Sequence, residues 1–164
     1  MGATVIAAAS SDEKLAFCRE LGADQTINYS ETDLKGAIKE LTGGRGVDVV
    51  YDPVGGDYAE PALRGMAWNG RYLVIGFASG PIPSIPLNLA LLKGCAIVGV
   101  FWGRFLGEEP AVARQNTEEV WDLFARGELK AAVTDVFPLA DFQAAYACMM
   151  ERRARGKVIL TLGE

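Results

Sequence analysis

The fold class follows from residues 4–29, TVIAAASSDEKLAFCRELGADQTINY. Residues 4–9 form an apolar run typical of a buried strand, and residues 24–29 indicate a second strand. Between the two strands, Ser10 or Ser11 can cap a helix that ends at a glycine. Because two parallel strands need a crossover of this kind, the stretch predicts a strand–helix–strand unit with parallel strands.

The same alternation continues through most of the chain, and only after residue 127 does the spacing change. Alternating strands and helices predict an α/β fold. We expect a Rossmann-type doubly wound parallel sheet over residues 1–133 and a short C-terminal α+β tail over residues 134–164. The expected helices cover residues 31–41, 57–66, 86–94, 109–126 and 141–153, and the expected strands lie within 47–56, 70–80, 95–103, 133–139 and 157–162.

Composition and charge exclude several classes of protein. Half of the 164 residues are hydrophobic, which is enough apolar material for the core of one domain. A formal net charge of −5 argues against a nucleic-acid surface, and no apolar run approaches the ~18 residues of a membrane helix. The first residues do not contain the basic segment of a secretory signal. We therefore expect a cytoplasmic protein that binds neither nucleic acid nor membrane.

The residue types available limit the chemistry further. The chain has no histidine, which removes a histidine general base, serine–histidine–aspartate triads and most catalytic zinc sites. Its three cysteines, Cys18, Cys95 and Cys148, form no CxxC pattern, so we expect neither disulfides nor a metal site. We expect no catalytic residue in this chain, and its chemistry must come from a bound cofactor or from protein outside it.

The turns after the strands are where a doubly wound parallel sheet binds ligands. Three of the five expected turns are rich in glycine, at residues 52–56, 76–80 and 101–103, which lets the backbone approach a ligand closely. Glycine also ends strands that bind nothing, and this alternative stays open. The phosphate-binding pattern GxGxxG is absent, and the nearest string, GGRGVDVV at residues 43–50, precedes a strand and is interpreted as a loop.

The end of the first strand indicates which nucleotide binds. An acidic residue at this position holds the ribose hydroxyls of NAD, but here the strand ends in AAASS and the first acidic residue is Asp12. Small hydroxyls together with Lys14 and Tyr29 suit the 2′-phosphate of NADP. The alternative is that Ser10 and Ser11 only cap the helix, and that Lys14 only lies on its solvated face.

Four strings carry a resemblance over essentially the whole chain, in order: ATVIAAASSDEKLAFCRELGADQTINYSE, GGRGVDVVYDPVGG, LALLKGCAIVGVFWG and RRARGKVILTL. Together they resemble the medium-chain dehydrogenase/reductase superfamily, in particular its zinc-independent NADPH:quinone oxidoreductases. The resemblance implies the C-terminal half of such an enzyme, preceded by a GroES-like catalytic domain, a central strand and a glycine-rich loop. It also implies hydride transfer from NADPH to a quinone or an α,β-unsaturated carbonyl, with acyl thioesters as a further substrate class.

The resemblance also implies the residues that bind the cofactor. Ser10, Lys14 and Tyr29 match contacts to the 2′-phosphate, and Ser11 is an adjacent candidate. Phe101 and Trp102 can equally be plain edge-strand packing. The remaining matches are Val54 and Gly55 for the turn past the ribose and pyrophosphate, Gly76, Phe77 and Ala78 with the neighbouring Ser79 for the nicotinamide side, Phe101, Trp102 and Gly103 for the loop over the nicotinamide, and Lys157 for a C-terminal contact.

The resemblance places the central strand of the sheet ahead of this chain. Residues 4–9 and 47–52 are then each expected to have an unpaired edge, which is a template for pairing with another chain. The isolated chain can close the gap between these two strands, borrow a strand from a neighbour, or be a fragment of a longer molecule. Our hypothesis is that it is a fragment. We also expect a homodimer through the edge strand Ala96–Trp102.

Three functions remain open at this stage. The leading hypothesis is the NADPH-binding portion of a quinone- or enone-reducing oxidoreductase, inactive as an isolated chain. The first alternative is a non-catalytic nucleotide-binding remnant or interaction domain. The second alternative is a Rossmann methyltransferase, because an α/β sheet with a glycine turn also suits S-adenosylmethionine.

Overall fold

The computed structural model of the chain describes residues 2–163. It contains two compact units, Met1–Trp102 and Gly103–Glu164. Every strand pair among the described residues is parallel, which confirms an α/β fold with parallel strands. The expected domain boundary after residue 133 lies inside the second unit and stays a prediction.

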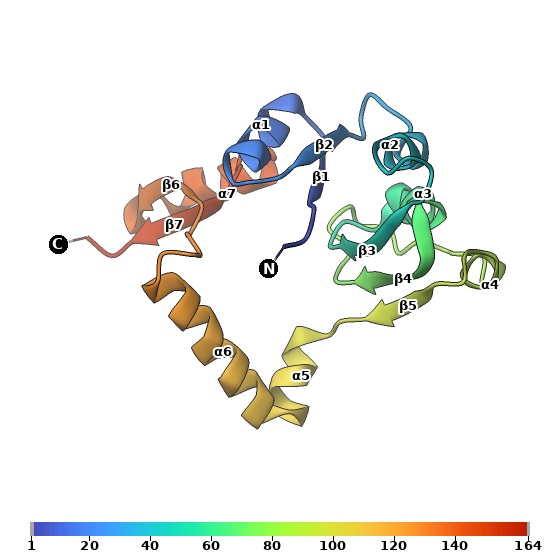
Figure 1. Cartoon of the computed structure of the whole chain (residues 1–164). Coiled ribbons are helices and arrows are strands. Elements are labelled where there is room, and N and C mark those ends of the chain that lie inside the picture. The colour runs from blue at the N-terminus through green and yellow to red at the C-terminus, as the bar shows by residue number, and fades with distance from the viewer. Residues whose placement is uncertain (1, 164) are drawn as a thin grey trace. The chain divides into compact units, whose positions relative to one another are not determined.

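The first unit alternates strands and helices along its whole length (Figure 1). Its first strand and helix agree with the expected strand–helix–strand unit, and Ser11 is the helix cap, with its Oγ accepting a hydrogen bond from the Lys14 N–H at 3.4 Å. The elements are β1 (Ile6–Ala9), α1 (Asp12–Glu20), β2 (Gln25–Asn28), α2 (Leu34–Leu41), β3 (Val47–Asp52), the 3-10 helix η1 (Gly56–Tyr58), α3 (Ala59–Arg64), β4 (Met66–Val74), α4 (Asn88–Lys93) and β5 (Ala96–Gly99).

The strands of the first unit form two sheets instead of one. β1 pairs only with β2, while β3, β4 and β5 form a three-stranded sheet with β4 in the middle. Figure 1 shows β1 and β3 as neighbouring strands with no strand between them. Within residues 2–163, β1 and β3 therefore each have one unpaired edge, as the sequence predicts.

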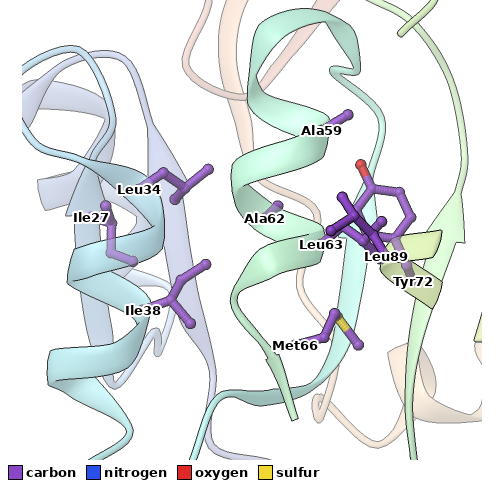
Figure 2. Close-up of a cluster of buried hydrophobic side chains, with 9 residues drawn as sticks. All are labelled: Ile27, Leu34, Ile38, Ala59, Ala62, Leu63, Met66, Tyr72 and Leu89. Atoms are coloured by element: carbon purple, nitrogen blue, oxygen red, sulfur yellow. The ribbon is translucent and has the colours of Figure 1, made fainter. Parts of the chain in front are cut away.

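One hydrophobic core connects the two sheets (Figure 2). Ile27 of β2 packs with the apolar side chains of α2, and α2 packs against α3, which covers the second sheet. Leu63 and Met66 are completely buried in this cluster. Truncating such a side chain to alanine costs about 2–5 kcal/mol, so this cluster holds β1–β2 and β3–β5 in one unit. Its buried members are Ile27, Leu34, Ile38, Ala59, Ala62, Leu63, Met66, Tyr72 and Leu89.

The structure of the second unit differs from the expected C-terminal tail. β6 (Val133–Pro138) and β7 (Lys157–Thr161) pair in parallel, and α7 (Phe142–Met150) connects them. The tail is therefore a small strand–helix–strand unit, and the expected α+β arrangement is wrong. A parallel pair requires a crossover, which α7 provides. The other elements of this unit are α6 (Pro110–Ala125) and the 3-10 helix η2 (Leu139–Asp141).

The segment after β5 also differs from the expectation. The expected strand over residues 95–103 ends at Gly99, and a helix, α5 (Trp102–Glu108), begins where a loop was expected. The Val100 N–H donates to the carbonyl of Val74 at 3.0 Å. Because β4 ends at Val74, residues beyond Val100 have no ladder partner on β4, and the chain leaves the sheet there.

Candidate nucleotide-binding site

The end of the β1–β2 sheet gathers the first group of predicted site residues. The Tyr29 N–H donates to the carbonyl of Ala9 at 3.1 Å, so Tyr29 directly follows the last ladder position. The Ser30 Oγ donates to the Ser10 carbonyl at 3.1 Å, which joins the two turns. With Ser11 and Lys14 in the first turn of α1, the structure brings Ser10, Ser11, Lys14 and Tyr29 to one edge of the sheet.

Asp12 is an acidic residue at this edge. Its Oδ1 accepts a hydrogen bond from the Asn28 Nδ2 at 3.0 Å, across the carboxyl ends of β1 and β2. The carboxylate is therefore engaged by a neighbouring amide of the sheet edge. Such a contact competes with the ribose hydroxyls that an acidic residue at a strand end binds in NAD-dependent folds.

The turn after β3 is organised by Asp52. Its Oδ1 accepts from the backbone N–H of Val54 at 2.8 Å and of Gly55 at 2.9 Å. Its Oδ2 accepts a hydrogen bond from the hydroxyl of Tyr72, on the adjacent strand β4. Because a carboxylate that accepts several hydrogen bonds holds its donors firmly, the backbone at Val54 and Gly55 is fixed by this one side chain.

Tyr72 is a largely buried partner of this carboxylate. Its side chain belongs to the hydrophobic core and only 5% of the residue is exposed. Burial raises the pKa of the Tyr72 hydroxyl well above its usual value, and the hydrogen bond to Asp52 raises it further. The hydroxyl therefore remains protonated at neutral pH and serves as a permanent donor to Asp52.

The turns after β3 and β4 are bonded to each other. The Ala78 N–H donates to the Pro53 carbonyl and the Ser79 N–H to the Val54 carbonyl, both at 3.0 Å. Gly55 has a φ of 66°, and a Cβ built on it would lie 2.8 Å from Cδ1 of Phe77. A side chain at position 55 is thus excluded both by the backbone and by its neighbour. The structure brings Val54 and Gly55 together with Gly76, Phe77, Ala78 and Ser79.

Ser79 has a polar atom that the fold leaves unsatisfied. Among residues 2–163 its buried Oγ has no hydrogen-bond partner. A Cβ added to Gly56 would contact this oxygen directly, so glycine keeps the space in front of it open. An unpaired buried hydroxyl carries a desolvation cost, which a bound polar ligand removes.

A pair of tyrosines connects the two edges. The ring centroids of Tyr29 and Tyr58 are 4.2 Å apart, and the rings are tilted by 44°. Tyr58 ends η1, directly after the glycine turn of β3, whereas Tyr29 directly follows β2. The contact therefore places the carboxyl ends of the two sheets next to each other.

The four remaining predicted residues lie after β5 or in the second unit. Phe101 and Trp102 follow β5, with 74% and 54% of each residue exposed. Gly103 and Lys157 belong to the second unit, where the Lys157 N–H donates to the Ala132 carbonyl at 2.6 Å. The proposed cofactor roles of these four residues stay predictions.

Sequence reasoning placed Asp52 in a ligand-binding turn, but it named neither Asp52 nor Tyr58 and Tyr72 as site residues. For Asp52 a signal is present, because an aspartate followed by Pro-Val-Gly-Gly commonly accepts hydrogen bonds from the turn that it begins. The other two have no comparable signal. Tyr58 and Tyr72 act through contacts with residues 29 and 20 positions away, which no local pattern indicates.

Neither a metal-ligand cluster nor a membrane-spanning helix is found within residues 2–163. The described residues contain no group of three or more histidine, cysteine, aspartate or glutamate side chains that can hold a metal ion. In the same part of the chain, no helix combines the length and the apolar character needed to cross a membrane.

Known proteins match this chain over nearly all of it. A family model described as "Zinc-binding dehydrogenase" matches residues 1–126. The quinone oxidoreductase-like protein 2 of Rattus norvegicus is 41% identical over 160 residues, which are 98% of this chain and 46% of the rat protein. The chain thus spans about half the length of the curated relatives that it matches.

Two solved structures with the same fold contain a nucleotide. The quinone oxidoreductase of Escherichia coli complexed with NADPH matches with a TM-score of 0.84 and 32% identity, over 97% of this chain and 49% of the bacterial chain. A mycobacterial protein complexed with NADPH matches with a TM-score of 0.84 and 31% identity, over 97% and 50% of the two chains.

Proposed function

This chain belongs to the zinc-binding dehydrogenase family of medium-chain dehydrogenases/reductases, and we propose that it is the NADPH-binding portion of a quinone- or enone-reducing oxidoreductase. The substrate class follows from the resemblance to quinone oxidoreductases and completes the proposal. A small-molecule quinone or α,β-unsaturated carbonyl then meets the cofactor in the complete enzyme. The cytoplasmic location also stays a prediction.

The observation that carries the proposal is the edge formed by β1 and β2. Ser10 follows β1, Ser11 caps α1 and Lys14 lies in its first turn. Tyr29 directly follows β2 at the same edge of the sheet. These side chains provide hydroxyls and one ammonium for a 2′-phosphate, while Asp12 is engaged by Asn28. NADH has a free ribose hydroxyl in place of that phosphate and gains less from such a set.

The glycine turns of β3 and β4 provide the second wall of the site. Their backbone is held open by Asp52 and by the bonds between the two turns, so a flat ligand can approach Val54, Gly55 and Gly76 closely. The unpaired Oγ of Ser79 is available to a polar group of the ligand. When bound, NADPH supplies a hydride. The residues of this chain bind and orient the cofactor without transferring a proton themselves.

The resemblance assigns further cofactor contacts to four more residues, which complete the proposal: Phe101, Trp102, Gly103 and Lys157. Their support is the position of the first two after β5 and the family resemblance.

A calorimetric titration of the 164-residue chain with NADPH, NADH and S-adenosylmethionine tests this function. We expect NADPH to bind most tightly, and we expect S-adenosylmethionine not to bind. A preference for NADH would contradict the phosphate assignment, and binding of S-adenosylmethionine alone would favour a methyltransferase. Absence of all binding would favour the alternative, a non-catalytic remnant or interaction domain.

We also propose a homodimer through the outer edge of β5. β5 pairs with β4 on one side only, and its four residues, Ala96–Gly99, are all exposed. The strand that can pair is shorter than the expected interface over Ala96–Trp102. β5 ends at Gly99, and α5 begins at Trp102. An exposed apolar edge strand pairs readily with a second copy of the same chain.

A further inference from the structure

Tyr58 lies where the two halves of the proposed nucleotide site meet. It ends η1, three residues after Gly55 in the turn that follows β3, and its ring centroid is 4.2 Å from that of Tyr29. Tyr29 belongs to the other half of the site, because it directly follows β2. Both tyrosines are half-buried and pack against the hydrophobic core cluster, so part of each residue stays accessible to a ligand.

The backbone of Tyr29 is held on both sides of the residue. Its N–H donates to the Ala9 carbonyl at 3.1 Å, and the carbonyl of the preceding Asn28 accepts from the Thr32 N–H, also at 3.1 Å. These bonds do not fix the ring, because the χ1 angle of a tyrosine has three staggered positions. The orientation of the ring therefore depends on the side chains that pack against it, and Tyr58 is one of them.

Tyr58 is placed by a turn that has little conformational freedom. The carboxylate of Asp52 accepts hydrogen bonds from two backbone N–H groups at the start of this turn, at 2.8 and 2.9 Å. Gly56, two residues before Tyr58, has a φ of 59° and is buried. Ala59, directly after Tyr58, belongs to the core and is 1% exposed. The Tyr58 backbone is thus fixed between the turn and the core, so its ring provides a fixed surface for the ring of Tyr29.

Recognition of a 2′-phosphate makes different demands on Lys14 and Tyr29. Lys14 presents a charged ammonium on a flexible stem, which can follow the phosphate. Tyr29 presents one O–H at the end of a rigid ring, and a hydrogen bond weakens steeply when its angle falls below about 120°. The contribution of Tyr29 to phosphate binding therefore depends on the orientation of its ring, whereas the contribution of Lys14 does not depend on such a fixed orientation.

We propose that Tyr58 is a positioning residue for phosphate recognition, and that its ring holds the ring of Tyr29 in the orientation in which the Tyr29 hydroxyl donates to the 2′-phosphate of NADPH. This inference rests on the proposed function, in which Tyr29 belongs to the phosphate site. Tyr58 acts through Tyr29 and makes no contact with the phosphate itself. An aromatic pair shifts an equilibrium by about two- to tenfold, which sets the size of the expected effect.

A purely structural role of Tyr58 predicts a different result. Both tyrosines pack against the core, so the loss of either ring also lowers the stability of the first unit. Lower stability weakens the binding of every nucleotide by the same factor, because it reduces the fraction of the chain that is competent to bind. The positioning role weakens only the binding of the ligand that has the phosphate. The ratio of two dissociation constants therefore separates the two roles.

Calorimetry of the 164-residue chain with 2′-phospho-ADP-ribose and ADP-ribose measures this ratio, taken as the Kd of ADP-ribose divided by the Kd of the phosphorylated ligand. We expect Tyr58→Ala to lower the ratio about threefold or more and to change the binding of ADP-ribose less than about twofold. Tyr58→Phe keeps the ring and should retain the ratio within about twofold. Tyr51→Ala removes an exposed tyrosine from β3 and is the control, which should also retain the ratio.

A double-mutant cycle assigns the effect to Tyr29. Tyr29→Phe removes the hydroxyl and should lower the ratio about threefold or more by itself. When Tyr58→Ala is added to Tyr29→Phe, no hydroxyl is left to misplace, and we expect no further change in the ratio. Far-UV circular dichroism checks that the variants are folded. Tyr58→Leu fills much of the same space without an aromatic ring, should also lower the ratio, and decides if Tyr58→Ala does not fold.

Three results would overturn the positioning role and leave the proposed function intact. They are an unchanged ratio in Tyr58→Ala and Tyr58→Leu, an equal loss of affinity for both ligands, and a further fall of the ratio when Tyr58→Ala is added to Tyr29→Phe. Equal binding of the two ligands by the unchanged chain, or binding of neither, would instead contradict the proposed function, and this inference with it.

Discussion

The hydroxyl of Tyr72 donates a hydrogen bond to the carboxylate of Asp52, which in turn holds the N–H groups of Val54 and Gly55. Tyr72 lies in the core on β4, whereas Asp52 ends β3. This chain of contacts couples the hydrophobic core to the turn that faces the proposed cofactor. A substitution of Tyr72 should therefore also affect the turn at Val54 and Gly55.

Tyr72→Phe removes only the donor hydroxyl and keeps the buried ring. A hydrogen bond to a charged group contributes about 1.5–3 kcal/mol, so the free energy of unfolding should fall by that amount. Urea denaturation measures the change. Tyr51→Phe, which alters an exposed hydroxyl on the neighbouring strand, is the control and should change stability by less than about 0.5 kcal/mol. Equal effects of the two substitutions would contradict the role of the Asp52 contact.

Tyr72 also gives the stability a dependence on alkaline pH. Its pKa in the folded chain is raised above the ordinary tyrosine value of 10.0. The stabilisation from the neutral hydroxyl is fully present below about pH 10, and it is lost as the pH rises above that value, because the unfolded chain then releases the proton first. Urea midpoints between pH 8 and 11 should fall more steeply for the unchanged chain than for Tyr72→Phe. Parallel curves would contradict this source of the pH dependence.

Gly55→Ala should disturb the turn through both its backbone and its neighbour. A positive φ costs a non-glycine residue about 1–2 kcal/mol, and the added Cβ meets Phe77 at 2.8 Å. Gly80→Ala is the matched control, because Gly80 also has a positive φ but no atom within 4 Å of an added Cβ. We expect Gly55→Ala to lose at least about 1 kcal/mol more than Gly80→Ala in urea denaturation. Equal losses would show that the two turns are not packed against each other in solution.

Lys14→Gln should weaken binding of NADPH about tenfold and leave binding of NADH unchanged, because only NADPH has the 2′-phosphate. Lys39→Gln changes an exposed lysine on α2 and serves as the control for net charge. Calorimetry of both variants with both nucleotides measures the effect. A similar loss for NADPH and NADH in Lys14→Gln would assign Lys14 to another part of the nucleotide.

Ile97→Lys should prevent dimerisation through β5, because a charge on the exposed edge opposes pairing with a second copy. Leu91→Lys places the same charge on α4, where the leucine is 80% exposed, and should leave the dimer intact. Sedimentation velocity distinguishes the two states. A monomeric unchanged chain, or a dimer that Ile97→Lys does not affect, would contradict the proposed interface.

Much of the fold could be predicted from the sequence because local patterns determine it. The apolar run ending at Ala9 gives β1, and glycines mark most turns after the strands. The helix α5 was missed because Gly103 and Gly107 lower its helix propensity. The parallel pairing of β6 and β7 also depends on tertiary contacts that no local pattern encodes.

The site could be predicted only where its residues follow strands directly. Ser10 and Tyr29 are found because each directly follows a strand, and the carboxyl ends of parallel strands lie at one edge. The Tyr72–Asp52 hydrogen bond joins residues 20 positions apart, and the Tyr29–Tyr58 contact joins two sheets. Such long-range pairs depend on how strands pair and pack in three dimensions, which no short string of sequence encodes.

The central claim is that the β1–β2 edge recognises the 2′-phosphate of NADPH. The most direct measurement compares the dissociation constants of 2′-phospho-ADP-ribose and ADP-ribose for the 164-residue chain, because the two ligands differ only in that phosphate. We predict that the phosphorylated ligand binds at least tenfold more tightly and that Lys14→Gln removes the difference. Equal binding of the two ligands, or tighter binding of ADP-ribose, would contradict the claim.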